Sequence, residues 1–380
     1  MDELEIGAGK NARRGYGLDE ISIVPSRRTR DAADVDVSFR LDAFDLAMPV
    51  FASALDAVVS PESAACLGAL GGIAAINLEG LWTRYEDPEP LLAEIALLDP
   101  AKATPRLQEI YAEPIKPTLL IERVRALGSD GMISCGAVTP QRAAELAPAI
   151  LSAELDILMI QGTVVSAEHV ASGVDPLNLR QFIYELDIPI VVGGCSSYQT
   201  ALHLMRTGAV GVLVGVGSGG TGESRGVLGI GVPQATAIAD AAGARSRHLE
   251  ETGVYVQVIA DGGMSKGGDI AKAIACGADA VMIGSALAAA SEAPGHGSIW
   301  PNSSFHQRLP RGTVERVGTL GTMEEILLGP SSEPTGRLNL VGALRQSMAM
   351  SGYATIREFH KAEVVVGEVP GERSVQASSS

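Results

Sequence analysis

Eight short apolar segments recur along the chain, and each is followed by residues with helical periodicity. Continuous apolar strands that alternate with amphipathic helices are typical of a parallel sheet covered by helices. Eight such units predict a closed (β/α)8 barrel. The alternative is an open doubly wound sheet, which usually has fewer strands and a glycine fingerprint after its first strand. The predicted strands are residues 48–52, 72–76, 132–134, 157–160, 188–192, 210–214, 256–260 and 280–283.

Two segments interrupt this alternation. The connection over residues 78–130 holds two helical patterns, 88–98 and 117–128, joined by a proline- and charge-rich piece. Residues 293–337 are rich in Gly, Pro and Ser, which predicts a long lid after the eighth strand. The tail, 371–380, has a composition typical of disorder. We therefore expect a single barrel domain over residues 1–370.

Composition excludes several classes of partner. The net charge of −16 disfavours nucleic acid and anionic membranes. The chain has no run of 18 apolar residues and no apolar N-terminal segment, so we expect neither a membrane span nor a signal peptide. No two cysteines form a CxxC pair, which predicts free thiols in the cytoplasm rather than a zinc or redox motif. The cysteines are Cys66, Cys135, Cys195 and Cys276.

Glycines concentrate in the loop after the sixth predicted strand, where residues 215–222 contain five of them. Glycines at this position let backbone N–H groups approach an anion closely. In barrels, the loops after strands seven and eight commonly form a phosphate site. Here Asp261 follows the seventh predicted strand and Ser285 follows the eighth. The pattern favours a phosphorylated ligand whose ribose hydroxyls donate to Asp261, although Asp261 alone could instead cap the next helix.

Two cysteines are also predicted at carboxyl ends of strands. Cys135 follows the third predicted strand and Cys195 closely follows the fifth. A thiol at such a position could face the pocket as a nucleophile, or it could serve only as a small apolar filler.

Several stretches resemble the IMP dehydrogenase/GMP reductase family over almost the whole chain. They are LDEISIVPSRRT, MPVFASALDAVVSPESAACLGALGGIAAI, VLVGVGSGG, VIADGGMSKGGDIAKAIACGADAVMIGSALA and LVGALRQSMAMSGY. The resemblance implies a (β/α)8 barrel that binds a purine nucleoside monophosphate and assembles as a homotetramer. It also implies NAD as cofactor and a monovalent cation such as K⁺.

The resemblance assigns expected roles to single residues. Nucleotide binding falls on Ser53, Ser218, Gly219, Gly220, Asp261, Gly262, Gly263, Gly284 and Ser285. Cofactor binding falls on Gln161, Gly162 and Cys195. Carbonyl ligands of the cation fall on Gly217, Gly219 and Gly222. Residues at catalytic loop positions are Glu223, Ser224 and Arg225.

The departures from the family pattern concern catalysis. Gly222 stands where the family has the cysteine whose thiolate attacks the purine, and glycine supplies no nucleophile. Ser224 replaces a usual Thr, Gln161 a usual Asp, and Cys195 a usual Asn. The lid lacks the Arg-Tyr pair with which the dehydrogenases activate water, and the regulatory tandem domains are absent.

Three hypotheses follow from these observations. The first is an IMP dehydrogenase-type oxidoreductase, with GMP reductase-type activity as a variant. The second is a non-catalytic regulatory protein that binds a purine nucleotide. The third is a different barrel enzyme that binds FMN or a sugar phosphate, which the whole-chain resemblance disfavours.

Overall fold

In the computed structural model, eight parallel strands close into a barrel with the order β10-β11-β12-β13-β6-β7-β8-β9. The structure describes residues 3–170, 176–219, 224–301, 305–306, 309–310 and 313–367. The predicted barrel is thus confirmed, and the open doubly wound sheet is excluded. The strands are β6 (Val50–Ala52), β7 (Ile73–Asn77), β8 (Cys135–Val138), β9 (Ile157–Gln161), β10 (Ile190–Cys195), β11 (Gly211–Val214), β12 (Gln257–Asp261) and β13 (Ala280–Ile283).

The third strand lies later than predicted. Strand β8 begins at Cys135, which pairs with Ala75 of β7 and Ile157 of β9. The apolar run at 132–134 leads into the strand, and Ser134 is held there by hydrogen bonds to the carboxylate of Asp156. Cys135 is therefore a fully buried residue at the amino end of its strand. The prediction that it follows the carboxyl end was wrong, because small residues of the strand itself lack the bulk that marks an apolar run.

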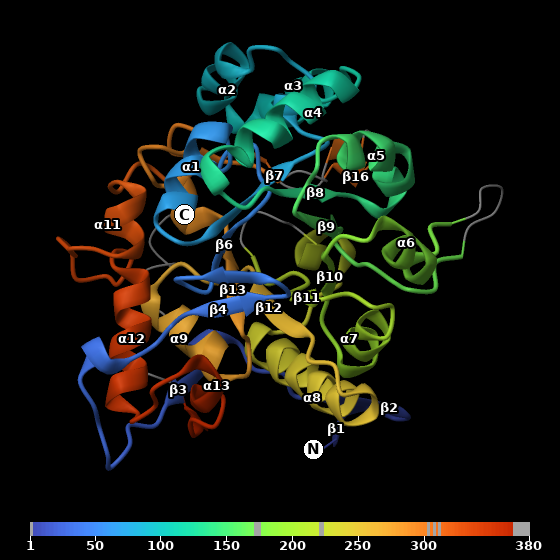
Figure 1. Cartoon of the computed structure of the whole chain (residues 1–380). Coiled ribbons are helices and arrows are strands. Elements are labelled where there is room, and N and C mark those ends of the chain that lie inside the picture. Colours follow the sequence, from blue (N-terminus) through green and yellow to red (C-terminus); the bar gives the residue numbers. More distant parts are fainter. Residues whose placement is uncertain are drawn as a thin grey trace.

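Helices surround the barrel on its outside (Figure 1). Several pack an apolar stripe against the strands, such as α1 against β7 and α8 against β12, whereas α12 packs against α9. The interior is built mainly from Ala, Val, Ile and Leu. The helices are α1 (Pro61–Ala69), α2 (Glu89–Ala96), α3 (Pro100–Ile110), α4 (Pro117–Leu127), α5 (Pro140–Ser152), α6 (Leu179–Leu186), α7 (Tyr198–Met205), α8 (Gln234–Thr252), α9 (Gly267–Ala275), α10 (Ser285–Ala288), α11 (Met323–Leu327), α12 (Leu340–Met350) and α13 (Ile356–Phe359).

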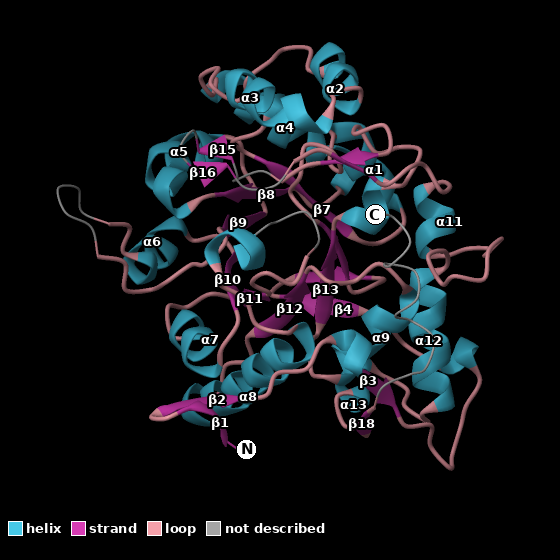
Figure 2. Ribbon diagram, turned by 180° about the vertical axis from the view of Figure 1, so that it is seen from behind, coloured by secondary structure: helices cyan, strands magenta, loops and turns pink. Residues whose placement is uncertain are grey.

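The connection between β7 and β8 contains one helix more than predicted. Its proline- and charge-rich middle piece forms α3, which starts with Pro100 and is capped by the side chain of Asp99. Proline is tolerated in the first turn of a helix, where its missing N–H has no intrahelical partner. Helices α2, α3 and α4 gather at one edge of the molecule (Figures 1 and 2).

An antiparallel hairpin closes the amino end of the barrel. Its strands are β4 (Phe39–Leu41) and β5 (Phe44–Leu46), which pair antiparallel. Leu41 and Leu46 are buried in one apolar cluster with Phe51 and Ile73 of the barrel. Because this end is plugged by side chains, ligands reach the barrel only from the carboxyl ends of its strands.

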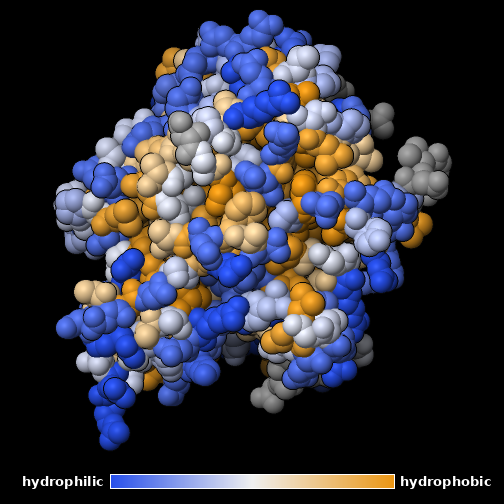
Figure 3. Space-filling view, viewed as in Figure 1, coloured by the Kyte–Doolittle hydropathy of each residue, from blue (hydrophilic) through white to orange (hydrophobic). Residues whose placement is uncertain are grey.

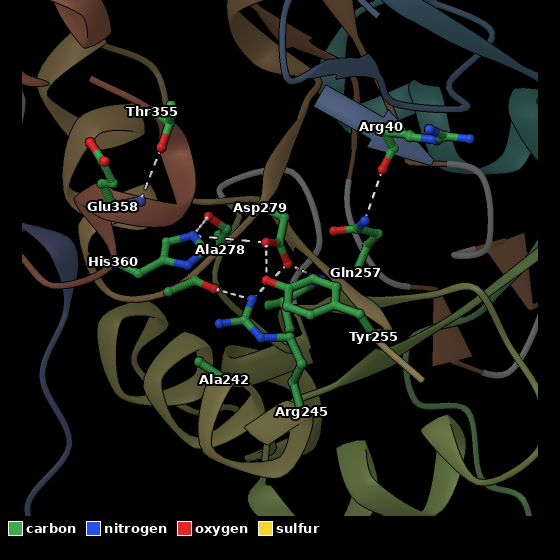
Figure 4. Close-up of polar contacts among 12 residues, drawn as sticks. Arg40, Ala242, Arg245, Tyr255, Gln257, Ala278, Asp279, Thr355, Glu358 and His360 are labelled. Carbon is green, nitrogen blue, oxygen red and sulfur yellow. Dashed lines mark hydrogen bonds and ion pairs between the residues drawn. The ribbon is translucent and has the colours of Figure 1, made fainter. Parts of the chain in front are cut away.

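The C-terminal segment is fastened beside this closed end. Strand β18 (Val364–Val366) pairs with β3 (Ile21–Ile23). The buried carboxylate of Asp279 accepts hydrogen bonds from Arg245 (2.7 Å) and Tyr255 (2.6 Å), and Nε2 of His360 donates to the carbonyl of Ala278 (2.9 Å; Figure 4). One polar cluster therefore joins α8, the start of β13 and the residue after α13.

The predicted lid segment holds short regular elements in the part that the structure describes. Strand β14 (Ser298–Ile299) pairs with β17 (Glu315–Arg316), and α11 follows. Two further pieces, β15 (Phe305–His306) and β16 (Leu309–Pro310), also pair. Trp300 is fully buried, so the entry to this segment is packed onto the barrel. Whether the segment closes over a ligand stays a prediction, and the tail at 371–380 lies outside the described residues.

Hydrophilic residues predominate along the outline of the molecule, and hydrophobic residues gather towards the middle of the face in Figure 3. Among the helices of the described residues, none is long and apolar enough to span a bilayer.

A short hairpin of β1 (Glu3–Gly7) and β2 (Lys10–Arg13) precedes the barrel.

Candidate active site

A cavity of about 750 Å³ lies at the carboxyl ends of the barrel strands. Residues that follow β6, β7, β8, β9, β11, β12 and β13 line it. The sequence-predicted residues that it brings together are Ser53, Gln161, Gly162, Gly217, Ser218, Gly219, Ser224, Asp261, Gly262, Gly263, Gly284 and Ser285. A volume of this size is within the usual range for small-molecule sites.

One wall of the cavity is formed by closely packed glycine turns. A Cβ atom on Gly215 would lie 1.9 Å from the carbonyl oxygen of Asp261, so no larger residue fits there. Gly262 and Gly263 adopt φ values of +82° and +79°, which residues with side chains rarely adopt. The hydroxyl of Ser218 donates to the same carbonyl of Asp261 at 2.9 Å. These contacts fix the loops after β11 and β12 against each other.

Asp261 ends β12, and its carboxyl group faces the cavity. The side-chain amide of Gln161 donates to Oδ2 of Asp261 at 3.0 Å. Burial raises the pKa of Asp261 to about 6, and the bond from Gln161 opposes that rise. The alternative role as a helix cap is wrong, because α9 begins only after Lys266, and Asp269 accepts from the backbone N–H of Lys266 there.

Ser53 and Gly284 adjoin each other beside this wall. The backbone N–H of Ser53 donates to Ile283 at 2.9 Å, and a Cβ on Gly284 would lie 3.6 Å from Cβ of Ser53. Ser285 follows and also lines the cavity. The ends of β6 and β13 therefore bring small residues to the same side as the glycine turns.

The opposite wall carries larger polar side chains. In the closed order of strands, β7 and β11 are four positions apart, so they stand across the barrel from each other. The residues of this wall are Asn77, Glu79, Arg84, Tyr111 and Thr139. Of these, only Asn77 directly follows a predicted strand, the one at 72–76. Arg84 and Tyr111 lie in the long connection, and no spacing in the sequence indicates that it folds back onto the cavity.

A buried polar group anchors this wall. The carboxylate of Asp56 accepts from Tyr111 at 2.6 Å and from Asn77 at 3.3 Å, and Trp300 donates to the hydroxyl of Tyr111 at 2.9 Å. Burial raises the pKa of Asp56 to about 6 against the opposing effect of these bonds. Burial and the charge of Asp56 raise the pKa of Tyr111, so Tyr111 stays a neutral hydroxyl. The contacts join the loop after β6, the long connection and the entry to the lid.

Of the two candidate catalytic residues that the structure describes, one lines the cavity and the other does not. Ser224 is buried and lines the cavity, whereas Arg225, in the same turn (Ser224–Leu228), is exposed. Gly220, Gly222 and Glu223 lie outside the described residues. Of the proposed cation ligands, Gly217 and Gly219 line the cavity.

Neither cysteine considered as a substitute nucleophile lines the cavity. The thiol of Cys195 lies 3.5 Å from the carbonyl oxygen of Leu213 within the barrel wall, and burial raises its pKa to about 12. Burial also raises the pKa of Cys135, at the closed end of the barrel. A buried thiol with a raised pKa supplies almost no thiolate near neutral pH. The expected cofactor contact of Cys195 likewise has no direct geometric support.

Fold and cavity together define a barrel protein whose open end has a glycine-rich wall suited to an anion and an enclosed carboxylate beside it. A family model described as IMP dehydrogenase / GMP reductase domain matches residues 15–325. The chain belongs to this family.

A solved structure and curated sequences of related proteins also resemble this chain. An IMP dehydrogenase/GMP reductase-like protein from Corynebacterium glutamicum has a crystal structure that matches with a TM-score of 0.91 and 45% identity, covering 96% of this chain and 98% of that one. An uncharacterized oxidoreductase of Mycolicibacterium smegmatis is 49% identical over 96% of this chain and 100% of its own length. The inosine-5′-monophosphate dehydrogenase of Methanocaldococcus jannaschii is 25% identical over 93% of each chain.

Proposed function

We propose that this chain binds a purine nucleoside monophosphate in the cavity and acts on it as an IMP dehydrogenase-type oxidoreductase. The observation that carries the proposal is the position of Asp261: its backbone carbonyl packs against the glycine turns, and its half-buried carboxylate, to which Gln161 donates, faces the cavity. An ionised carboxylate accepts two hydroxyl donors, as vicinal ribose hydroxyls require. Backbone N–H groups of the adjacent glycines would hold the phosphate.

Gln161 supports this use of Asp261. A carboxylate at residue 161, which the family pattern usually has, would place a second negative charge where the amide now donates at 3.0 Å. The neutral amide instead orients the carboxylate and leaves its remaining acceptor sites for the ligand. We propose that Ser53, Gly284 and Ser285 complete the nucleotide site, and that Gly162 and Gln161 also border the cofactor.

The residues of the cavity also fit a nicotinamide dinucleotide beside the nucleotide, since the guanidinium of Arg84 and the neutral side chains of Asn77, Tyr111 and Thr139 line the side opposite the glycines, together with Glu79. Such a cofactor would supply the acceptor for the hydride that leaves the purine C2 as oxygen from water is added. We propose that the buried hydroxyl of Ser224 orients that water, with Glu223 and Arg225 beside it in sequence. We propose these roles without a covalent bond to the protein, because Gly222 provides no thiolate.

A non-catalytic purine-nucleotide-binding protein is the second candidate. It is favoured by a specific observation: the two strand cysteines are buried, with raised pKa values, and Gly222 replaces the loop nucleophile. GMP reductase-type activity needs the same nucleophile and is weakened by the same fact. Nucleophile and base act as a unit, so losing one removes most of their joint effect.

Steady-state assays with IMP plus NAD and with GMP plus NADPH test these candidates. We expect a Gly222→Cys variant to turn over faster than the parent, because it restores a nucleophile at the family position. Gly222→Ser, which adds similar bulk without a thiolate, is the matched control. A parent that binds nucleotide but shows no turnover would favour the second candidate, and an inactive Gly222→Cys variant would contradict the loop assignment.

Nucleotide affinity should depend on pH through Asp261. Ribose hydroxyls donate to the ionised carboxylate, so binding should weaken as pH falls through its pKa of about 6. Between pH 7.5 and 5.0 the ionised fraction falls by about tenfold, and the Kd should rise by up to that factor. Calorimetric titration with GMP measures this. In Asp261→Asn this contribution should vanish, leaving only the titration of the ligand phosphate. An unchanged pH profile in the variant would contradict the assignment.

The remaining features of the proposal follow the family. We propose a homotetramer in the cytoplasm, one barrel domain over residues 1–370, and a monovalent cation held by carbonyls of Gly217, Gly219 and Gly222. The four free cysteines are consistent with a reducing compartment. Light scattering of the purified protein tests the assembly, and nucleotide affinity with and without K⁺ tests the cation.

A further inference from the structure

Arg84 is a buried cation that faces the cavity from the wall opposite the glycines. It follows the turn Leu81–Thr83 after β7, and 7% of its surface is exposed. Its Nε donates to the carbonyl of Glu79 at 3.0 Å, and its Nη1 donates to the carbonyl of Glu113. These two carbonyls precede α2 and follow α3, so the guanidinium plane is fixed by the chain on both sides of these two helices.

One terminal nitrogen of the Arg84 guanidinium is still able to donate hydrogen bonds to a ligand. Within the described residues, Nη2 of Arg84 makes no hydrogen bond, and no carboxylate lies within ion-pair distance of the group. The nearby carboxylate of Asp56 already accepts from Tyr111, Asn77 and the backbone N–H of Leu81. A cation enclosed by protein is costly unless an anion pairs with it. The carboxylates of Asp56 and Glu79 act on Arg84 from beyond ion-pair distance, so its terminal nitrogen remains open to an anion that enters the cavity.

This anion is distinct from the nucleotide phosphate of the proposed function. Arg84 follows β7, which stands across the barrel from β11 and the glycine loop. Among the described residues that line the cavity, Arg84 is the only basic one, and the lining also includes the carboxylates of Glu79 and Asp261. Glycine N–H groups on the far wall serve one phosphate without help from a side-chain cation.

We propose that Arg84 binds the diphosphate of a dinucleotide that occupies the cavity beside the purine nucleotide, and that it selects this second ligand by charge. The inference rests on the proposed function for the identity of the first ligand. A planar guanidinium with a free terminal nitrogen is well suited to a phosphate oxygen. The hydroxyls of Thr139 and Tyr111 border the same wall. The long connection thus contributes to recognition as well as covering the barrel.

Calorimetric titration of the GMP-saturated protein tests the proposal with three probes: NAD, ADP-ribose and nicotinamide riboside. For Arg84→Met we expect the Kd of NAD and of ADP-ribose to rise by about 10- to 100-fold, the usual effect of losing a charged hydrogen bond. Nicotinamide riboside, which lacks the diphosphate, should bind parent and variant equally. Arg142→Met is the matched control, since Arg142 lies near Arg84 on α5 but does not line the cavity, and it should change these values less than about twofold.

Two further measurements distinguish binding of the diphosphate by Arg84 from a purely structural role of this residue. Arg84→Lys keeps the charge but loses the fixed fork, and should retain the dependence of NAD affinity on salt that Arg84→Met loses. The Kd of GMP should be the same in all variants. Parent-like NAD binding by Arg84→Met would overturn the inference and leave the proposed function intact. Failure of the parent to bind GMP would instead contradict the proposed function, while an NAD affinity sensitive to Arg84 would still support the role of Arg84. If the parent binds neither NAD nor ADP-ribose, the inference is wrong.

Discussion

Asp261→Ala should weaken binding of GMP or IMP by about 100-fold, because it removes a charged acceptor for two ribose hydroxyls. The side chain is held in place by Gln161, so the acceptor is oriented before the ligand arrives. Fluorescence or calorimetric titration measures the effect at pH 7.5, where the carboxylate is ionised. Asp240→Asn is a suitable control, since this surface carboxylate on α8 pairs with Arg13 and does not line the cavity.

Removing the charge of Asp261 should weaken nucleotide binding but raise the stability of the fold at neutral pH. The folded-state pKa of Asp261 is raised to about 6, above its ordinary value of 3.8, so the ionised form is disfavoured in the folded state. The resulting penalty is absent below the ordinary pKa, grows between about pH 4 and 6, and is complete above pH 6. Asp261→Asn should therefore be more stable than the parent at pH 7.5, with a difference that disappears near pH 4. A variant that is less stable at neutral pH, or that binds nucleotide as the parent does, would show that Asp261 has a structural role instead.

Asp279→Ala should lower the free energy of unfolding by about 3–5 kcal/mol, the usual effect of leaving a buried charge without its partner. It would strand Arg245 at the closed end of the barrel and remove the acceptor for Tyr255 and for the backbone N–H of Val258 (Figure 4). Both members of the ion pair are less than 10% exposed, at 8% and 3%, so water cannot replace the lost bonds. Urea denaturation measures the change.

The control for this prediction lies on the same helix. Arg247 pairs with Glu251 at 2.7 Å, but both side chains are solvent-accessible, and Arg247→Ala should lower the free energy of unfolding far less than Asp279→Ala does. The double variant Arg245→Met/Asp279→Leu should be less destabilised than Asp279→Ala, because it leaves no unpaired charge. Equal effects of Asp279→Ala and Arg247→Ala would contradict the role of the buried cluster. Nucleotide affinity should be unchanged in every variant that folds, since the cluster is at the end away from the cavity.

Much of the fold follows from periodicity. Seven of the eight predicted strands coincide with barrel strands within a few residues, since a strand buried on both faces must be apolar throughout. The exception is β8, where Cys135, Gly136 and Ala137 are too small to mark an apolar run. Helix α3 was missed because its proline- and charge-rich composition resembles a loop.

The sequence by itself determined the barrel, the order of its loops and the residues at the strand ends, including Asp261 and the glycines. Those properties are local, since a strand end lies at the mouth of the barrel wherever the sheet closes. Only the tertiary structure decided which residues oppose the glycines. Arg84 and Tyr111 reach the cavity because the connection between β7 and β8 returns to its wall and because Asp56 and Trp300 hold Tyr111 in place. Such contacts join segments up to 189 residues apart in sequence, as between Tyr111 and Trp300, and no local pattern encodes them.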